Sequence, residues 1–305
     1  MKDKIMGGII GHVVGDALGV PVEFTTRAFC KTNPVTGMRG YGTYNQPAGT
    51  WSDDSSMLFA TMESLMLNKC FIRSDMMNRF YRWAMHGAYT PHGEAFDIGG
   101  TTRKAIARWA VGIYECGLTD ENSNGNGSLM RIIPFAIADC EYWTIKEASE
   151  MTHAHPRSTV ACYLYSAIVR RVLHGATLTE AIKETMWEYT GVPEMGHYAR
   201  LNILQDLTED EIRSSGYVVD TLEAALWCAL TTDNYKDCVL KAVNLGEDTD
   251  TIGAIAGGLA GVMYGFDAIP AEWVNALQCK EYVLEMANRF VGWVYEHTGT
   301  AKGGI

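Results

Sequence analysis

The sequence predicts an all-α protein with a single compact domain. Successive stretches place apolar residues three and four positions apart, which is the spacing of amphipathic helices, whereas the alternation typical of strands is rare. The 305 residues contain no Pro-rich, Ser-rich or single-charge segment that would act as a linker. Chains of this length often form two domains, but without such a boundary we expect residues 1–305 to form one multi-helix bundle.

The first predicted helix covers residues 5–20. Its apolar side chains recur on one helical face, and glycines from Gly7 to Gly19 lie between them. Each glycine weakens a helix by about 1 kcal/mol relative to Ala, so this density indicates that another helix or a ligand approaches the backbone closely. Pro21 ends the helix, and residues 25–50 are predicted to be irregular because Gly, Pro, Asn and Thr occur throughout.

Helical patterns then follow one another to the end of the chain. Residues 190–216 lack such a pattern and are the one candidate for an insertion or a lid, while residues 217–219 give the best strand pattern but are too few to establish a strand. The predicted helices cover residues 54–68, 75–86, 101–114, 128–139, 145–153, 157–173, 178–189, 220–231, 235–243, 251–264 and 279–297.

Composition and charge exclude several classes of protein. Apolar residues make up 47% of the chain, enough for a large core, and the net charge of -11 argues against nonspecific binding to nucleic acid or to an anionic membrane. The eight cysteines are scattered without a Cys-x-x-Cys pair, which favours a reducing compartment. The N-terminus does not resemble a secretory signal and no run of 18 apolar residues occurs. We therefore expect a soluble, cytoplasmic protein that binds neither membrane nor nucleic acid.

An acidic cluster marks the start of the predicted 54–68 helix. Ser52, Asp53 and Asp54 lead directly into its apolar pattern. Such residues often cap helices and favour the positive end of the helix dipole. Adjacent buried carboxylates, however, are costly without a cation, and carboxylate and hydroxyl oxygens suit Mg²⁺ or Mn²⁺. Taken alone, the cluster fits a cap better than a metal site.

A second cluster repeats the same logic nearly 200 residues later. Asp248, Asp250 and Thr251 precede a helix rich in glycine and alanine. Two such clusters are harder to explain as two coincidental caps, and together they supply enough oxygens for two six-coordinate ions completed by water. The glycine-rich helices at residues 7–19 and 253–261 are then expected to pack closely at the centre.

Four motifs, in this order, resemble those of the ADP-ribosylglycohydrolase family, which includes the dinitrogenase-reductase-activating glycohydrolase and the ADP-ribosyl-arginine hydrolases. Each is weak alone, but the ordered set is specific and spans residues 5 to 264. The resemblance implies a compact all-α domain with a central cleft and a binuclear Mg²⁺ or Mn²⁺ centre. The motifs are Gly15-Asp16-Ala17-Leu18-Gly19 with Glu23, Ser52-Asp53-Asp54, Gly125-Asn126-Gly127-Ser128-Leu129-Met130-Arg131 and Glu247-Asp248-Thr249-Asp250-Thr251.

The resemblance also implies roles for individual residues. Glu23 matches a glutamate assigned to catalysis or gating in the family, and the 125–131 loop matches the one that wraps the substrate diphosphate. Small residues with free amides before a helix form an anion cradle, which agrees with this role. The implied metal ligands are Ser52, Asp53, Asp54, Asp248, Asp250 and Thr251, and the implied substrate contacts include Gly125, Asn126, Gly127, Ser128 and Met130.

Three further positions match the family less firmly. Asp97 lies in a loop that covers the site in arginine-directed members, where a carboxylate can pair with a guanidinium. Its alternative role is the N-cap of the predicted 101–114 helix. His153 matches a residue near the distal ribose or adenine, and Tyr217 matches an aromatic against the adenine, although ordinary core packing explains Tyr217 nearly as well.

The resemblance implies a hydrolase that removes ADP-ribose from a modified protein, most simply from arginine, acting as a monomer. Glu23, Asp53 and Asp54 are the candidates for proton transfer, with Asp97 facing the leaving group, and the sequence does not distinguish between them. Alternative substrates are serine-linked, O-acetyl- or nucleic-acid-linked ADP-ribose. An antitoxin or immunity protein that binds and blocks an ADP-ribosyltransferase is an alternative of another class.

Overall fold

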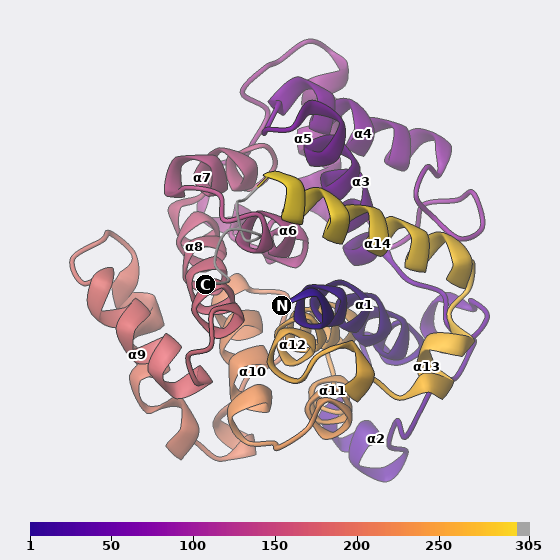
Figure 1. Ribbon diagram of the computed structural model, residues 1–305, viewed down its shortest axis with the longest axis vertical. Helices are drawn as coiled ribbons and strands as arrows, with labels where there is room; N and C mark the ends of the chain where they lie inside the picture. The colour runs from indigo at the N-terminus through magenta and orange to yellow at the C-terminus, as the bar shows by residue number, and fades with distance from the viewer. Residues whose placement is uncertain (298–305) are drawn as a thin grey trace.

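In a computed structural model, residues 1–297 form a bundle of fourteen α-helices joined by loops and 3₁₀ turns (Figure 1). The structure describes residues 1–297, and no β-strand occurs among them. The all-α prediction is therefore confirmed. The helices are α1 (Lys2–Gly19), α2 (Arg27–Thr32), α3 (Asp53–Asn68), α4 (Arg73–His86), α5 (Gly100–Ala110), α6 (Ile133–Ile137), α7 (Tyr142–Glu150), α8 (Pro156–Leu173), α9 (Leu178–Glu188), α10 (Val218–Leu230), α11 (Tyr235–Val243), α12 (Thr249–Tyr264), α13 (Ala271–Ala276) and α14 (Lys280–His297).

Most predicted helices occur within a few residues of their expected bounds, but two local predictions are wrong. The predicted 128–139 helix is a 3₁₀ turn, Leu129–Arg131, followed by the short α6, which has Pro134 in its first turn. The short strand pattern at residues 217–219, too brief to establish a strand, covers the N-cap residue and first turn of α10. The irregular 25–50 stretch contains α2, whose six residues are too few to show a helical period.

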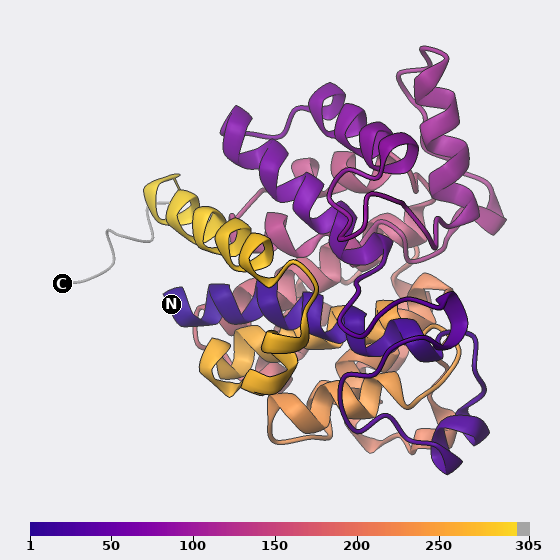
Figure 2. The same cartoon turned by 90° about the vertical axis from the view of Figure 1, so that its right-hand side faces the viewer.

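Helices α1 and α12 form the centre of the bundle and lie side by side (Figures 1 and 2). Their glycines face one another along an antiparallel seam: a Cβ on Gly15 would lie 1.9 Å from the carbonyl oxygen of Gly253, and one on Gly11 would lie 2.4 Å from that of Gly257. Real Cβ atoms do not approach an oxygen so closely, so the seam requires glycine. The expected close packing of the two glycine-rich helices is confirmed.

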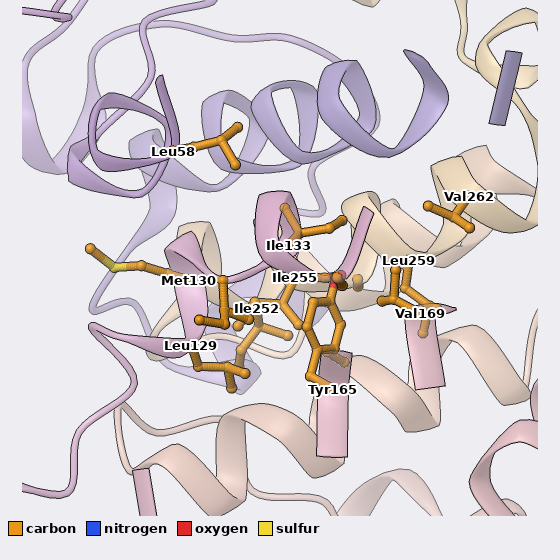
Figure 3. Packing of buried hydrophobic residues seen from close by; sticks show 14 of the residues in the cluster. Leu58, Leu129, Met130, Ile133, Tyr165, Val169, Ile252, Ile255, Leu259 and Val262 are labelled. Carbon is orange, nitrogen blue, oxygen red and sulfur yellow. The ribbon is translucent and has the colours of Figure 1, made fainter. Parts of the chain in front are cut away.

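The other side of α12 packs against a layer formed by α8, α6 and the 3₁₀ turn Leu129–Arg131. Figure 3 shows Ile252 and Ile255 of α12 meeting Ile133 and Tyr165. The phenol of Tyr165 donates a hydrogen bond of 2.9 Å to the carbonyl oxygen of Ile255, which satisfies a polar group that is otherwise enclosed by apolar side chains. This layer carries the loop at residues 125–131 on a rigid base.

By length and hydropathy, Lys2–Val22 is the one segment among residues 1–297 that passes for a membrane span, with a mean hydropathy of 1.5. In the structure 94% of this window is buried inside the protein, as in the core helix of a globular domain. Its apolar composition is therefore accounted for by contacts with α12, α14 and their neighbours.

The 190–216 segment packs into the bundle instead of standing free as a lid. Its 3₁₀ turns, Met195–Asp206, pack against α9 and α10 through buried apolar side chains. The hydroxyl of Tyr198 donates to the carbonyl oxygen of Arg157 at 2.7 Å. The structure thus gives this segment a place in the core.

Candidate functional site

The two acidic clusters converge where α3 and α12 begin. Ser52 is the N-cap residue of α3, and its hydroxyl donates to Asp54 Oδ2 at 3.0 Å. Thr251, in the first turn of α12, donates to the same oxygen at 3.4 Å. Capping and clustering are therefore both present, because the helix start that Ser52 caps also brings Asp54 to the second cluster.

Asp16 completes the cluster, although the sequence-based set of site residues omitted it. It comes from α1, where its Oδ1 accepts from the amide of Ser52 at 2.9 Å and its Oδ2 from the hydroxyl of Ser55 at 2.5 Å. Carboxylate oxygens of Asp16, Asp54 and Asp250 all lie within 4.8 Å of one another. A lone acid on an apolar, glycine-rich helix was the signal for this residue.

A second group of three acids shares Asp250 with the first. Carboxylate oxygens of Glu23, Asp97 and Asp250 also lie within 4.8 Å of one another. Glu23 follows the 3₁₀ turn Val20–Val22 that ends the α1 segment, so both groups stand at the same end of the α1–α12 pair. One shared carboxylate between two sets of oxygen ligands is an arrangement that suits two neighbouring cations.

Several buried carboxylate oxygens at this site lack hydrogen-bond partners among residues 1–297 and could therefore bind cations. Asp54 Oδ1, Asp248 Oδ1, Asp250 Oδ2 and Glu23 Oε2 are buried and have no hydrogen-bond partner among the described residues. Such oxygens are costly to bury unless a cation binds them. Hard oxygen ligands without sulfur or imidazole match Mg²⁺ or Mn²⁺, so the donor set fits.

The electrostatics of the cluster agree with this assignment. Burial raises the pKa of Asp16 to about 6, and burial together with the neighbouring Asp97 raises the pKa of Glu23 to about 9. Burial and the surrounding carboxylates likewise raise the pKa values of Asp53, Asp54 and Asp250 well above the ordinary range. Without added positive charge, the protein holds these groups together only by keeping protons on some of them.

Asp97 faces the acids and does not cap a helix. The residue before α5 is Gly99, which makes no side-chain cap bond. Asp97 has a φ of +57° and accepts a 2.5 Å hydrogen bond from the hydroxyl of Tyr44, whose ring packs 5.0 Å from that of Phe96. The N-cap alternative for Asp97 is therefore wrong. Tyr44 lies in the stretch predicted to be irregular, and no sequence signal pointed to it.

A cleft of about 240 Å³ opens over the acids. Carboxylates line one part of it, and the 125–127 loop and His153 line another. Within the described part of the chain, neither lysine nor arginine lines the cleft. A larger hollow of about 470 Å³ lies near Arg73, but none of the predicted site residues lines it. We therefore take the smaller cleft over the acids as the candidate site. The cleft is lined by Glu23, Phe24, Asp53, Asp97, Gly99, Gly100, Thr101, Thr102, Gly125, Asn126, Gly127, Met130, His153, Gly216, Asp248 and Thr251.

The 125–131 loop is tied directly to the acidic cluster. Asn126 donates from its side chain to Asp248 Oδ2 at 2.8 Å and to Thr221 Oγ1 at 2.9 Å, and from its backbone amide to the carbonyl oxygen of Gly216 at 3.1 Å. One side chain therefore fixes the loop relative to the candidate metal ligands.

Two predicted substrate-binding residues do not line the cleft with their side chains. The hydroxyl of Ser128 is fully buried and accepts from Ser149 Oγ at 2.8 Å. Tyr217 lies beside the cleft-lining Gly216, and its hydroxyl is 3.5 Å from Arg157 Nη1. The structure thus brings Gly125, Asn126, Gly127, Met130 and His153 into the cleft and leaves Ser128 and Tyr217 at its margin.

The fold is shared with known proteins. A solved structure described as an ADP-ribosylglycohydrolase-related protein complex superimposes with a TM-score of 0.81 at 30% sequence identity, covering 97% of this chain and 98% of that one. The family model for ADP-ribosylglycohydrolase matches residues 1–301. The chain belongs to the ADP-ribosylglycohydrolase family, whose members are metal-dependent hydrolases.

The chain is also similar to individual enzymes of this family. The chain is 34% identical to the ADP-ribosylarginine hydrolase Tri1 of Pseudomonas putida (strain GB-1), over 93% of this chain and 77% of that protein. It is 31% identical to the ADP-ribosyl-[dinitrogen reductase] glycohydrolase of Rhodospirillum rubrum, over 92% of each. The resemblance found from the ordered motifs is thereby confirmed.

Proposed function

We propose that this hydrolase cleaves the N-glycosidic bond between ADP-ribose and an arginine side chain of a modified protein, with two Mg²⁺ or Mn²⁺ ions as cofactors. The observation that carries the proposal is the acidic cleft: Glu23, Asp53 and Asp97 line it, and no lysine or arginine among residues 1–297 does. A guanidinium leaving group suits such a wall, since carboxylates bind it by charge-assisted hydrogen bonds. Relatives named as ADP-ribosylarginine hydrolases support the same substrate.

The candidate ligands divide into those that hold the ions and those that face the substrate. When bound, the ions supply Lewis acidity and lower the pKa of a coordinated water. Glu23 lines the cleft and carries an unpartnered oxygen, so we assign proton transfer to the leaving nitrogen to it. The ions would be held by Ser52, Asp53, Asp54, Asp248, Asp250 and Thr251, joined by Asp16 as a residue that orients Ser52.

The remaining cleft residues would hold ADP-ribose. Among the described residues, the amides of Gly125 and Gly127 have no backbone acceptor, which leaves them available to phosphate oxygens. Asn126, Met130 and His153 line the same wall. In this proposal Ser128 and Tyr217 act through their backbone and packing, because neither residue is among those that line the cleft.

The test is release of ADP-ribose from matched arginine-linked and serine-linked peptides, with Mg²⁺, with Mn²⁺ and with chelator. Metal-dependent release from the arginine peptide is the expected result. Release from the serine peptide alone would retain the metal chemistry but reject the arginine assignment. Tight binding of ADP-ribose without release from either peptide would point to another linkage or to a blocking role.

Replacing Asp97 by asparagine is expected to weaken recognition of the arginine leaving group. The variant removes the charge that pairs with a guanidinium, so kcat/KM on the arginine peptide should fall about 10- to 100-fold, the loss of one charged hydrogen-bond pair. Glu94→Gln, an exposed acid three residues earlier, is the matched control and should change little. Equal activity of Asp97→Asn and wild type on the arginine peptide would remove Asp97 from leaving-group recognition.

Cation binding is expected to stabilise the protein, and more so as pH rises. In the folded metal-free protein the pKa values of Asp16 and Glu23, about 6 and about 9, exceed their ordinary values of 3.8 and 4.5. The folded state therefore binds more protons than the unfolded state, and its stability falls as pH rises from about 4 towards about 9. Saturating Mn²⁺ should raise the melting temperature most at the alkaline end, as scanning calorimetry with and without chelator can measure.

We further propose that the enzyme works as a monomer in the cytoplasm, on ADP-ribosylated protein and with ADP-ribose as its product. The eight cysteines are free thiols, which supports a reducing compartment. Sedimentation of the purified protein tests the oligomeric state.

A further inference from the structure

His153 is linked to the core by the side chains of Thr152 and Arg131, to which the proposed function gives no role. Thr152 Oγ1 lies 2.9 Å from His153 Nδ1, and Arg131 Nη2 donates to the same hydroxyl oxygen at 2.9 Å. All three residues are buried, yet His153 also lines the cleft. A short chain of polar contacts thus runs from the core to the wall that faces the substrate.

Arg131 gives this chain a direction. A guanidinium only donates hydrogen bonds, so Thr152 Oγ1 accepts from Arg131 and its own hydrogen needs another acceptor. The atom within reach among the described residues is His153 Nδ1. The opposite arrangement, in which Nδ1–H donates to Thr152, would leave a buried hydroxyl hydrogen without an acceptor, which is unfavourable.

The charge state of the imidazole agrees with this direction. Burial, and secondly the nearby Arg131, lower the pKa of His153 to about 3, so the ring is neutral in the physiological range. Arg131 remains a cation because burial lowers its pKa only to about 10. Its other contacts are the carbonyl oxygen of Ala148 at 3.0 Å and the face of the Phe80 ring at 4.7 Å. No carboxylate pairs with it among the described residues.

We propose that Arg131 and Thr152 are positioning residues that fix His153 as the neutral tautomer with its proton on Nε2, so that it donates a hydrogen bond to an oxygen of the ADP-ribose diphosphate. Phosphate oxygens only accept, so they require a donor at this atom. The edge of the ring that carries Nε2 is left open by glycine: a Cβ on Gly127 would lie 2.7 Å from Cε1 and 3.1 Å from Nε2. The identification of the ligand rests on the proposed function, whereas the tautomer does not.

Nitrogen NMR of the full-length protein tests the tautomer directly. The His153 signals are assigned by their loss in His153→Gln, and the wild type is expected to show a protonated Nε2 and an unprotonated Nδ1. Thr152→Val removes the hydroxyl with little change of volume, so the ring should lose its fixed tautomer. Thr152→Ser keeps a hydroxyl and should restore it.

Binding and kinetics test the consequence for the ligand. In Thr152→Val the Kd for ADP-ribose and the KM for an ADP-ribosylated arginine peptide should rise about 10-fold, as expected when a hydrogen bond to a charged group is weakened. The value of kcat should change less than the KM, because the contact is made equally in ground and transition states. Thr185→Val is the matched control, since this buried threonine lies in α9 and its hydroxyl has no partner among the described residues.

Two results would overturn the inference: a proton on Nδ1 of His153 in the wild type, or an unchanged tautomer and Kd in Thr152→Val. The wild-type spectrum gives an answer even if a variant fails to fold. The measurements also separate this inference from the proposed function, because neither the spectrum nor ADP-ribose binding requires hydrolysis. Absence of ADP-ribose release with Nε2 protonated would reject the proposed function and leave the positioning roles intact.

Discussion

Asp250→Asn is expected to reduce hydrolysis strongly and to stabilise the metal-free protein. Asp250 belongs to both groups of three acids, so its carboxylate lies between the acids proposed to hold the ions and those proposed to face the substrate. Asparagine keeps the shape but removes the charge that would hold the ions, and kcat/KM should fall at least about 100- to 1,000-fold, the loss typical of a removed electrostatic contact at the reacting centre.

The same substitution should increase stability although it lowers activity. Burial, and secondly the neighbouring carboxylates, raise the pKa of Asp250 well above its ordinary range, so a charged Asp250 is unfavourable in the metal-free protein. Relieving this repulsion should raise the melting temperature in chelator by a few degrees, at about 2–4 °C for each kcal/mol in a domain of this size. Calorimetry and peptide hydrolysis measure the two effects in one preparation. Asp267→Asn, an exposed acid in a 3₁₀ turn after α12, is the control. A variant that keeps full metal-dependent activity would refute the role of Asp250.

Gly257→Val is expected to prevent folding. A Cβ at residue 257 would lie 2.3 Å from the carbonyl oxygen of Gly11, and its neighbours along the seam, such as Gly253, are as closely packed against α1. The two helices would have to separate over their whole length. The loss of folding free energy should therefore exceed the roughly 1–3 kcal/mol that overpacking usually causes. Soluble yield and circular dichroism report the outcome, and Gly257→Ala in urea gives a graded value if Val leaves no folded protein.

Gly292→Ala provides the matched control in helix α14. Nothing lies within 4 Å of a Cβ at this exposed position, so alanine should stabilise the helix by about 0.5–1 kcal/mol. A glycine-to-alanine change thus stabilises or destabilises according to what the new methyl group meets. If Gly257→Val folds with normal stability, the seam is looser than its backbone contacts indicate.

The sequence predicted the all-α fold and the meeting of the two acidic clusters because both depend on local patterns. Helical spacing identified the long helices, and two hydroxyl-acid clusters identified Asp54 and Thr251, which the structure brings within hydrogen-bond distance. Asp16 could have been added, since an acid in an apolar helix requires a partner. Tyr44 could not, because its hydrogen bond to Asp97 depends on how a stretch without any helical period folds against a distant loop.

Side-chain direction was the other part that patterns did not determine. Ser128 occupies the predicted loop, but the hydroxyls of Ser149 and Ser128 meet in the core and turn this side chain away from the ligand. Residues 190–216 looked like an insertion because their 3₁₀ turns do not repeat as α-helices do, yet Tyr198 and Leu201 are buried. Irregular spacing in a sequence therefore says little about whether a segment is peripheral.

The seam between α1 and α12 also constrains how this protein can diverge. It ends at the site: Thr249 donates to the carbonyl oxygen of Gly19 at 2.8 Å, one residue before Asp250. A substitution that loosens the seam is expected to displace the acids as well. Selection for catalytic activity therefore also preserves the packing of α1 against α12. New specificities are then expected to arise outside the seam, at residues such as Phe24, Tyr44 and Asp97, which belong to neither α1 nor α12.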